Sequence, residues 1–396
     1  MKTTEYKDSE VGRIPADWKV AQLKDLTDII TGATPSTSIN EYWNGDIPWM
    51  SSGELNMKLV RSVYGRITQK GYDSCGTHMI PPLCVLIGLA GQGKTRGTAA
   101  INYISLCTNQ SIASILPSSY FDSFFLFYWL DNQYYNLRML SAGDGGRGGL
   151  NKQLLLNLWV PLPPLKEQNA IANSLSSIDS LISSLDELVE KKRMIKDGLM
   201  QELLTGKKRL AKFNGEWKQI TLGEYCSIVM GQSPSSTFYN QNGVGLPLIQ
   251  GNSDFENRKS IIRTYTSYIT KTCNQNDTIM SVRAPVGAVG KASSDSCLGR
   301  GVCAFRTDTD FLFYYMQYNE DKWGQFSKGS TFDSVNRDDL CAVIISVPPS
   351  KKEESAICDI LSSFDKDIEQ AISQRDKYLL IKQGMMQQLL TGKTRL

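Results

Sequence analysis

Residues 199–210 read LMQELLTGKKRL, and residues 385–396 read MMQQLLTGKTRL. The match extends upstream, because IANSLSSIDSLI (171–182) is followed 186 residues later by ICDILSSFDKDI (357–368). A second pair of motifs lies 199 residues apart: DWKVAQLKDL (17–26) with ITGATPS (30–36), and EWKQITLGEY (216–225) with VMGQSPS (229–235). The chain therefore repeats the order head, helix, head, helix, which permits an internal two-fold axis.

Each repeated helix carries a long apolar seam. Alternating steps of four and three from Ile171 and from Ile357 meet apolar residues at eight of ten positions in each copy, which is typical of a coiled coil. Lysine or arginine interrupts the seam at Lys192 and Lys196 and at Arg375 and Lys382. The predicted seam comprises Ile171, Leu175, Ile178, Ile182, Leu185, Leu199 and Leu203, and then Ile357, Leu361, Phe364, Ile368, Tyr378, Met385 and Leu389.

Charge along the helices indicates how they pair. Residues 166–190 carry a net charge of −4 and residues 191–212 carry +6, while 351–374 carry −3 and 375–396 carry +4. Antiparallel pairing sets each acidic half beside a basic half and opposes the helix dipoles, so an antiparallel coiled coil that separates the heads is predicted. The alternative is that each helix packs on its own head as a surface helix.

The heads are predicted to be mixed α/β, each with many short strands. The predicted division is a first head at 1–157, a first helix at 158–210, a second head at 211–342 and a second helix at 343–396. Trp18 and Trp217 occupy the same place in both heads and are predicted to be core anchors. The expected strands include Cys84–Gly88, Ile279–Val282 and Val343–Val347, and the expected helices lie within Tyr120–Tyr135 and Asp310–Trp323.

Composition excludes several classes of protein. Apolar residues make up 41% and charged residues 21%, as in ordinary globular proteins, and no apolar run approaches the length of a membrane span. The nine cysteines include no CxxC pair, and His78 is the single histidine, which argues against a zinc site and a disulfide framework. A cytoplasmic location is expected. The net charge of +3 does not by itself indicate nucleic-acid binding.

One motif favours a different function. Residues 88–95, GLAGQGKT, fit the GxxxxGK[ST] pattern of phosphate-binding loops, and an apolar strand precedes them. The following residues, RGTAAINY, are poor material for the helix that this site requires. A nucleotide-binding protein is therefore kept as the alternative, and a glycine-rich β-turn is preferred. Methyltransferase, nuclease and Ser/His/Asp motifs are not apparent, so the chain is predicted to be non-catalytic.

Several motifs resemble those of one known family. The stretches ITGATPS, EYWNGDIPWMSSGEL (41–55), VPLPPLKEQNAIA (160–172) and LMQELLTGKKRL look like the specificity subunit of type I restriction–modification systems. In the second copy GQSPSSTFYN (231–240), GLPLIQGN (245–252) and MMQQLLTGKTRL look like the repeat of the same family. The resemblance covers essentially the whole chain, although VPPSKKEESAI (347–357) departs from the usual PLPPLKEQ form.

The resemblance implies a division of labour between subunits. Each head would be a target recognition domain that reads one half of a bipartite, asymmetric site in double-stranded DNA. The helices would set the spacer and dock two modification subunits, which would bind S-adenosylmethionine and methylate adenine N6. Two restriction subunits would use ATP and Mg, so this chain itself would hold no cofactor or metal. The recognition subunit of another methyltransferase–nuclease complex, or a purely structural coiled-coil scaffold, remain as alternatives.

Polar and basic side chains in turns and glycine-rich segments are the candidates for DNA contact. Arginine can read guanine with two hydrogen bonds, whereas serine and threonine more often hold phosphate. For each candidate a structural role is an equal alternative. The candidates are Gln92, Lys94, Arg96, Arg138 and Arg147 in the first head, and Arg258, Arg283, Arg300, Lys328, Ser330 and Thr331 in the second.

Overall fold

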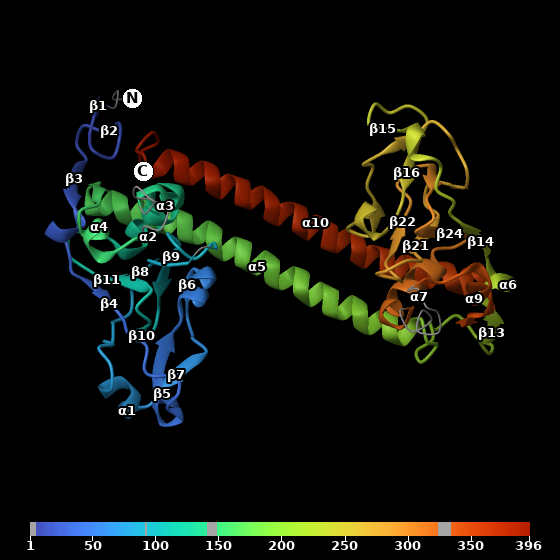
Figure 1. Cartoon of the computed structure of the whole chain (residues 1–396), viewed down its shortest axis with the longest axis horizontal. Coiled ribbons are helices and arrows are strands. Elements are labelled where there is room, and N and C mark those ends of the chain that lie inside the picture. The colour runs from blue at the N-terminus through green and yellow to red at the C-terminus, as the bar shows by residue number, and fades with distance from the viewer. Residues whose placement is uncertain (1–4, 92, 141–148, 324–333) are drawn as a thin grey trace. The chain divides into compact units, whose positions relative to one another are not determined.

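Two compact units make up the chain. The computed structural model describes residues 5–91, 93–140, 149–323 and 334–396. Residues 1–185 and 374–396 form the first unit, and residues 186–373 form the second. Each unit thus contains one head and part of both long helices, α5 (Leu165–Leu203) and α10 (Lys351–Leu389) (Figure 1). The predicted division separates heads from helices, whereas the two compact units each combine a head with helix segments. The predicted division is not tested and stays a prediction.

Both long helices lie within the predicted helix segments, 158–210 and 343–396, but each is shorter because a strand precedes it: β12 (Trp159–Leu162) before α5 and β25 (Ile344–Val347) before α10. Each is 39 residues long, or about 58 Å at 1.5 Å per residue. Pro163 and Pro164 precede α5, and the first helix ends three residues before Gly206. Every predicted seam residue is buried or half-buried, which confirms the apolar periodicity.

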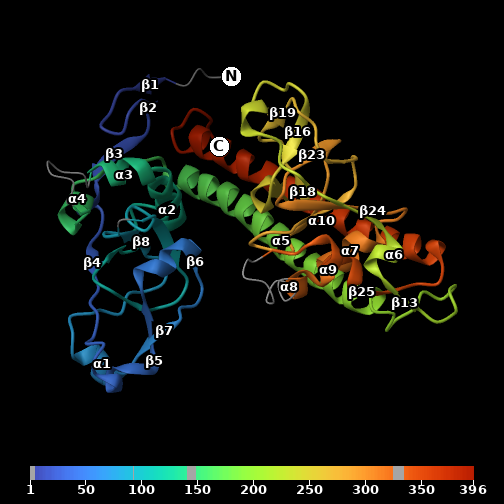
Figure 2. The same cartoon turned by 45° about the vertical axis from the view of Figure 1, so that its right-hand side comes forward.

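The first unit is built on a five-stranded sheet in the order β4-β11-β8-β9-β6. Its central strands β8, β9 and β11 are buried along their whole length, as their apolar sequences predict. The helix α2 (Ser123–Asn132) lies against β8, as Figure 2 shows, and also contacts β9. A three-stranded sheet, β10-β5-β7, and the pair β12-β3 complete the strands. The strands are β3 (Lys19–Gln22), β4 (Ile29–Thr31), β5 (Trp43–Met50), β6 (Leu59–Val60), β7 (Gly65–Ile67), β8 (Val85–Gly88), β9 (Ala99–Asn102), β10 (Cys107–Thr108), β11 (Ile112–Ile115) and β12 (Trp159–Leu162), with a separate hairpin of β1 (Tyr6–Lys7) and β2 (Ile14–Pro15).

The second unit repeats this arrangement. Its six-stranded sheet runs β14-β24-β21-β22-β18-β17, and its five-stranded sheet runs β15-β19-β16-β23-β20. The pair β13-β25 corresponds to β3-β12, and the helix α7 (Phe311–Tyr318) packs on β22 as α2 packs on β9. The strands are β13 (Lys218–Thr221), β14 (Ser227–Met230), β15 (Tyr239–Asn240), β16 (Leu246–Ile249), β17 (Phe255–Glu256), β18 (Lys259–Ser260), β19 (Tyr265–Thr266), β20 (Thr272–Cys273), β21 (Thr278–Ser281), β22 (Val289–Lys291), β23 (Ser296–Leu298), β24 (Val302–Arg306) and β25 (Ile344–Val347).

Each of the two expected helical segments in the heads contains two short helices instead of one. The helix expected within Tyr120–Tyr135 begins at Ser123, because the Asp122 side chain accepts a hydrogen bond from Phe125 N at 2.8 Å and caps the first turn. A second helix, α3 (Tyr134–Leu140), follows it. The expected segment Asp310–Trp323 likewise divides into α7 and α8 (Glu320–Trp323). The remaining short helices are α1 (Gln69–Asp73), α4 (Lys152–Leu156), α6 (Leu222–Tyr225) and α9 (Arg337–Ala342).

Within each unit the two helix segments run antiparallel. In the second unit Lys192 pairs with Asp367 and Lys196 with Asp365, so the residue number rises along α5 while that of its partner falls along α10. In the first unit Glu167 pairs with Arg395 and Asp179 pairs with Lys382, so the partner's number again falls as the first number rises. The predicted direction of pairing is therefore confirmed inside each unit, and the coiled coil as a whole stays a prediction.

Candidate nucleic-acid interface

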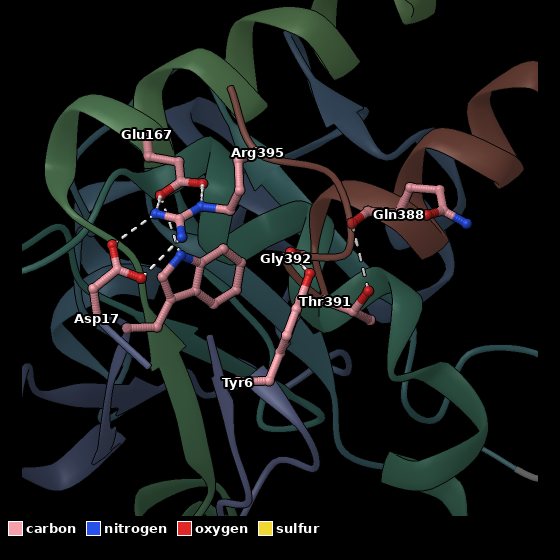
Figure 3. Close-up of polar contacts among 8 residues, drawn as sticks. Tyr6, Asp17, Glu167, Gln388, Thr391, Gly392 and Arg395 are labelled. Atoms are coloured by element: carbon pink, nitrogen blue, oxygen red, sulfur yellow. Dashed lines mark hydrogen bonds and ion pairs between the residues drawn. The ribbon is translucent and has the colours of Figure 1, made fainter. Parts of the chain in front are cut away.

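The segment that follows α10 is fixed to the first head by an anchor around the buried Trp18. Trp18 is fully buried, and its Nε1 donates to Glu167 at 3.1 Å. Arg395 donates to Glu167 at 2.5 and 2.8 Å and to Asp17 at 2.7 and 2.9 Å (Figure 3). Hydrogen bonds from Arg395 lower the pKa of Asp17. Gly392 has φ +67°, and a side chain there would lie 2.4 Å from the ring of Pro15 and 3.1 Å from that of Trp18.

The second head repeats this anchor with the end of α5. Arg209 donates to Glu353 at 2.6 and 2.8 Å, and these residues lie 186 positions before Arg395 and after Glu167. Gly206, with φ +70°, lies against the ring of Trp217. Trp18 is buried and Trp217 packs against the second core, so their prediction as core anchors is confirmed.

A second repeated cluster explains the lysines that interrupt the seam. Lys196 Nζ lies 2.5 Å from Asp365, Tyr314 donates to that carboxylate at 2.9 Å, and the ammonium sits over the tyrosine ring. In the first unit Lys382 lies 2.7 Å from Asp179, and Tyr128 donates to Asp179 at 2.7 Å. Burial, the largest cause, raises the pKa of both phenols, so each remains a neutral donor. The seam lysines are thus paired cations inside each unit.

In the first head the candidate residues gather at the loop between β8 and β9. Lys94 is exposed, and its carbonyl accepts from Thr98 Oγ1 at 2.7 Å and from Tyr134 OH at 3.1 Å. Arg138 donates to the carbonyls of Gly93 at 2.7 Å and of Arg96 at 3.2 Å, so its guanidinium holds this loop. These contacts favour the structural role for Arg138. The side chain of Lys94 is exposed to solvent.

The same loop excludes the phosphate-binding alternative. A nucleotide site needs the strand and glycine-rich loop to lead into a helix whose N–H groups face phosphate. Instead, β8 is followed by the antiparallel strand β9, so the segment is a β-hairpin. At Gly88 a side chain would lie 2.2 Å from the carbonyl of Thr95, which closes the loop on itself. The glycines here serve a tight turn, and the nucleotide-binding interpretation is wrong.

In the second head two of the candidate arginines line one open pocket. Arg283 and Arg300 are both exposed, and the pocket that they line has a volume of about 860 Å³. Arg258 is engaged elsewhere, with Glu320 at 2.6 Å and the Val289 carbonyl at 3.3 Å, which favours a structural role. The remaining candidates, Gln92, Arg147, Lys328, Ser330 and Thr331, lie outside the described residues.

Other kinds of site find little support in the described part of the chain. Among these residues no cluster of three or more His, Cys, Asp or Glu side chains could hold a metal ion. All nine cysteines are free thiols, and burial raises the pKa of Cys84 and Cys273 to about 12. No described helix is long and apolar enough to cross a membrane.

Comparison with known proteins places the chain in a family. A model described as the type I restriction modification DNA specificity domain matches residues 15–191 and again residues 214–375. The chain belongs to this family. It is a DNA specificity subunit of the type I restriction–modification class, with one specificity domain in each repeat.

Relatives cover the whole chain. A provisionally named type I restriction enzyme MjaX specificity subunit of Methanocaldococcus jannaschii is 29% identical over 419 residues, which span 100% of this chain and 97% of the relative. The MjaVIII specificity subunit of the same organism is 23% identical over 100% of this chain and 97% of its own length. The solved type I restriction–modification S subunit from M. genitalium has the same fold, with a TM-score of 0.65 at 16% identity and 98% of each chain covered.

Proposed function

We propose that each head reads one half of a bipartite, asymmetric DNA site. The observation that carries this proposal is that two units with the same strand order and the same anchors present different side chains. The order β4-β11-β8-β9 recurs as β14-β24-β21-β22, whereas the exposed loops differ in sequence. A shared frame with two different surfaces suits one task performed on two different base sequences.

The chain supplies recognition, and its partners supply chemistry. We infer two adenine-N6 methyltransferase subunits that bind S-adenosylmethionine and two restriction subunits that use ATP and Mg. The hairpin at Lys94 removes the single catalytic motif that the sequence offered, which supports a non-catalytic chain. A net charge of +3 is small for a DNA-binding protein, so the partners would share the phosphate contacts.

Exposed apolar pairs on the long helices support docking of two identical partners. Met194 and Ile195 on α5 are 68% and 43% exposed. Leu380 and Ile381 on α10 lie 186 positions later and are 70% and 39% exposed. Adjacent apolar residues at matched places in both repeats, open to solvent, form one equivalent contact surface per unit. Two copies of one subunit fit a pair of equivalent surfaces.

Exchange of one head tests the proposal. Residues 222–342 are replaced by the corresponding head of another family member, which leaves Arg209, Gly206 and Trp217 in place. Methylated adenines are then mapped in cells that carry the variant and its partners. We expect the half-site of the second head to change, with the first half-site and the spacer retained. A change in both half-sites would show that the heads do not read independently.

A further inference from the structure

One short turn occupies the same position in both heads. In the first head it joins β10 to β11, and Ile112 N donates to Asn109 O at 3.2 Å. In the second it joins β23 to β24, and Val302 N donates to Gly299 O at 3.2 Å. The second residue of each turn is exposed. That residue is Gln110 in the first head and Arg300 in the second.

Pairing on both sides fixes the equivalence of the two turns. The strand before each turn pairs in parallel with β5 or β16, and the strand after it pairs antiparallel with β8 or β21. Asn109 N donates to Met50 O at 3.1 Å, and Gly299 N donates to Ile249 O at 2.7 Å. Gln110 and Arg300 therefore leave the same point of the same backbone frame, and only the side chains differ.

A hydroxyl residue supports each turn. Thr34 Oγ1 donates to Gln110 Oε1 at 2.6 Å, which orients the amide and leaves its NH2 group without a partner among the described residues. Ser233, 199 positions after Thr34, accepts from the backbone N of Arg300 at 3.0 Å. This contact holds the backbone and leaves the Arg300 guanidinium without a partner in the described part of the chain.

The surroundings of Arg300 form an open, positively charged pocket. It measures about 860 Å³ and is lined also by Arg283, with no acidic side chain among the described residues that line it. Gly231 and Gly301 keep the backbone close, because a side chain there would lie 2.1 Å from the Gly299 carbonyl and 2.2 Å from the Gln250 carbonyl. The glycines keep side chains out of the pocket, and Arg300 supplies a cation. The open volume can therefore hold a flat polar ligand.

We propose that residues 110 and 300 are a matched pair of base-reading positions. Gln110 reads an adenine in the half-site of the first head, and Arg300 reads a guanine in the half-site of the second. An amide can bond adenine N6 and N7 together, and a guanidinium can bond guanine O6 and N7 together. This inference rests on the proposed function and assigns specific bases within it.

The difference between the heads argues against a phosphate contact at this position. The phosphate backbone is alike at every sequence, so a phosphate-holding residue in a repeated frame keeps its charge. Here the frame is retained while a neutral amide in one head is replaced by a cation in the other. A change in hydrogen-bonding pattern at a fixed backbone position is what two different bases require.

Reciprocal substitutions test the assignment in the complete chain with its methyltransferase partner. We make Gln110→Arg and Arg300→Gln, and map methylated adenines at single-base resolution. Gln110→Arg is expected to change one adenine of the first half-site to guanine, and Arg300→Gln to change one guanine of the second half-site to adenine. The other half-site and the spacer are retained in each case. Arg337→Gln, which removes an exposed arginine at the start of α9, is the matched control and leaves the site unchanged.

Binding of the purified complex to duplexes substituted at each position gives the second readout. Arg300→Gln should weaken binding to the cognate guanine by about tenfold or more and leave the salt dependence unchanged. Arg300→Lys, which keeps the charge, should show part of this loss. An equal loss on every sequence with a lower salt slope would assign a phosphate contact and overturn the inference. Unchanged specificity in folded variants would also overturn it, whereas a wild-type complex with no bipartite preference would overturn the proposed function instead.

Discussion

Removal of the Asp365 carboxylate tests the cluster that pairs the seam lysine. Lys196 Nζ lies 2.5 Å from this carboxylate, with side chains 11% and 35% exposed, and Tyr314 donates to it at 2.9 Å. Asp365→Ala leaves the ammonium with Gln317 Oε1 at 3.2 Å and the ring of Tyr314. Breaking a fully buried pair costs about 3–5 kcal/mol. Because Asp365 is partly exposed to water, we expect Asp365→Ala to lower the free energy of unfolding by about 2 kcal/mol.

The chain contains its own controls for this substitution. Asp367, two residues on in the same helix, pairs with Lys192 at 2.6 Å but is 50% exposed. Asp367→Ala should therefore cost only about 0.2–1 kcal/mol, as exposed ion pairs do. Asp179→Ala removes the equivalent carboxylate of the first unit, where the side chains are 18% and 19% exposed, and should match or exceed Asp365→Ala.

Because the chain has two compact units, a single unfolding curve does not report the stability of either unit alone. The assay therefore follows each unit separately. Hydrogen exchange of amides in residues 186–373 reports the second unit, and exchange in the first unit serves as the internal reference. The double variant Lys196→Met with Asp365→Leu should be more stable than Asp365→Leu alone, because it no longer contains an unpaired ammonium. Equal effects of Asp365→Ala and Asp367→Ala, within about 0.5 kcal/mol, would refute the reasoning.

Four further outcomes are expected. Met194→Asp with Ile195→Asp should weaken binding of the methyltransferase partner in titration calorimetry while leaving the melting temperature unchanged, whereas Gln201→Asp, an exposed control on α5, should do neither. The folded pKa of Asp17 lies below its ordinary value of 3.8, so its contribution to stability is present above that value and disappears as pH falls through the folded pKa. Arg395→Gln should erase this part of the pH dependence of unfolding, and identical pH profiles would contradict it. One heptad inserted into both α5 and α10 at the boundary of the units adds about 10 Å, so the preferred spacer should lengthen by about three base pairs in a methylation-mapped spacer library. The isolated chain with DNA, labelled S-adenosylmethionine, ATP and Mg should show no turnover, and turnover proportional to chain concentration would contradict this.

Helical periodicity made the frame predictable. A seam such as Ile171 to Leu203 repeats over many turns, so one irregular residue hardly weakens the pattern. Both long helices were therefore predicted, although the predicted segments extend several residues beyond the helix ends. Trp18 and Trp217 marked the core of each head because they occupy the same place in both repeats. Trp18 is fully buried, and Trp217 is partly buried against the second core. Short helices were placed less well, since a single cap such as Asp122 decides where they begin.

Side chains that act across the fold could not be predicted from local pattern. Gln110 was missed because it follows an ordinary strand, and its equivalence to Arg300 comes from strand pairing rather than from similar sequence. The partners of Lys196 and Lys382 were missed for a related reason. Their acceptors, Asp365 and Asp179, lie on the other helix, although their spacing of 186 residues was a usable signal. Arg138 and Arg258 were candidates for DNA contact because sequence alone hides the carbonyls and carboxylate that engage them.

The anchor at the end of α10 has a consequence for synthesis on the ribosome. The core of the first unit includes Met386, Leu389 and Leu390, and its anchor needs Arg395. The second unit is contiguous at 186–373 and has all of its residues before these emerge. At about 5–20 residues per second, some 200 residues of further translation leave the first head without its last core residues for about 10–40 s. The head that is made first is thus the last to complete its core. Loss of residues 386–395 alone would remove part of the core and the anchor of the first unit.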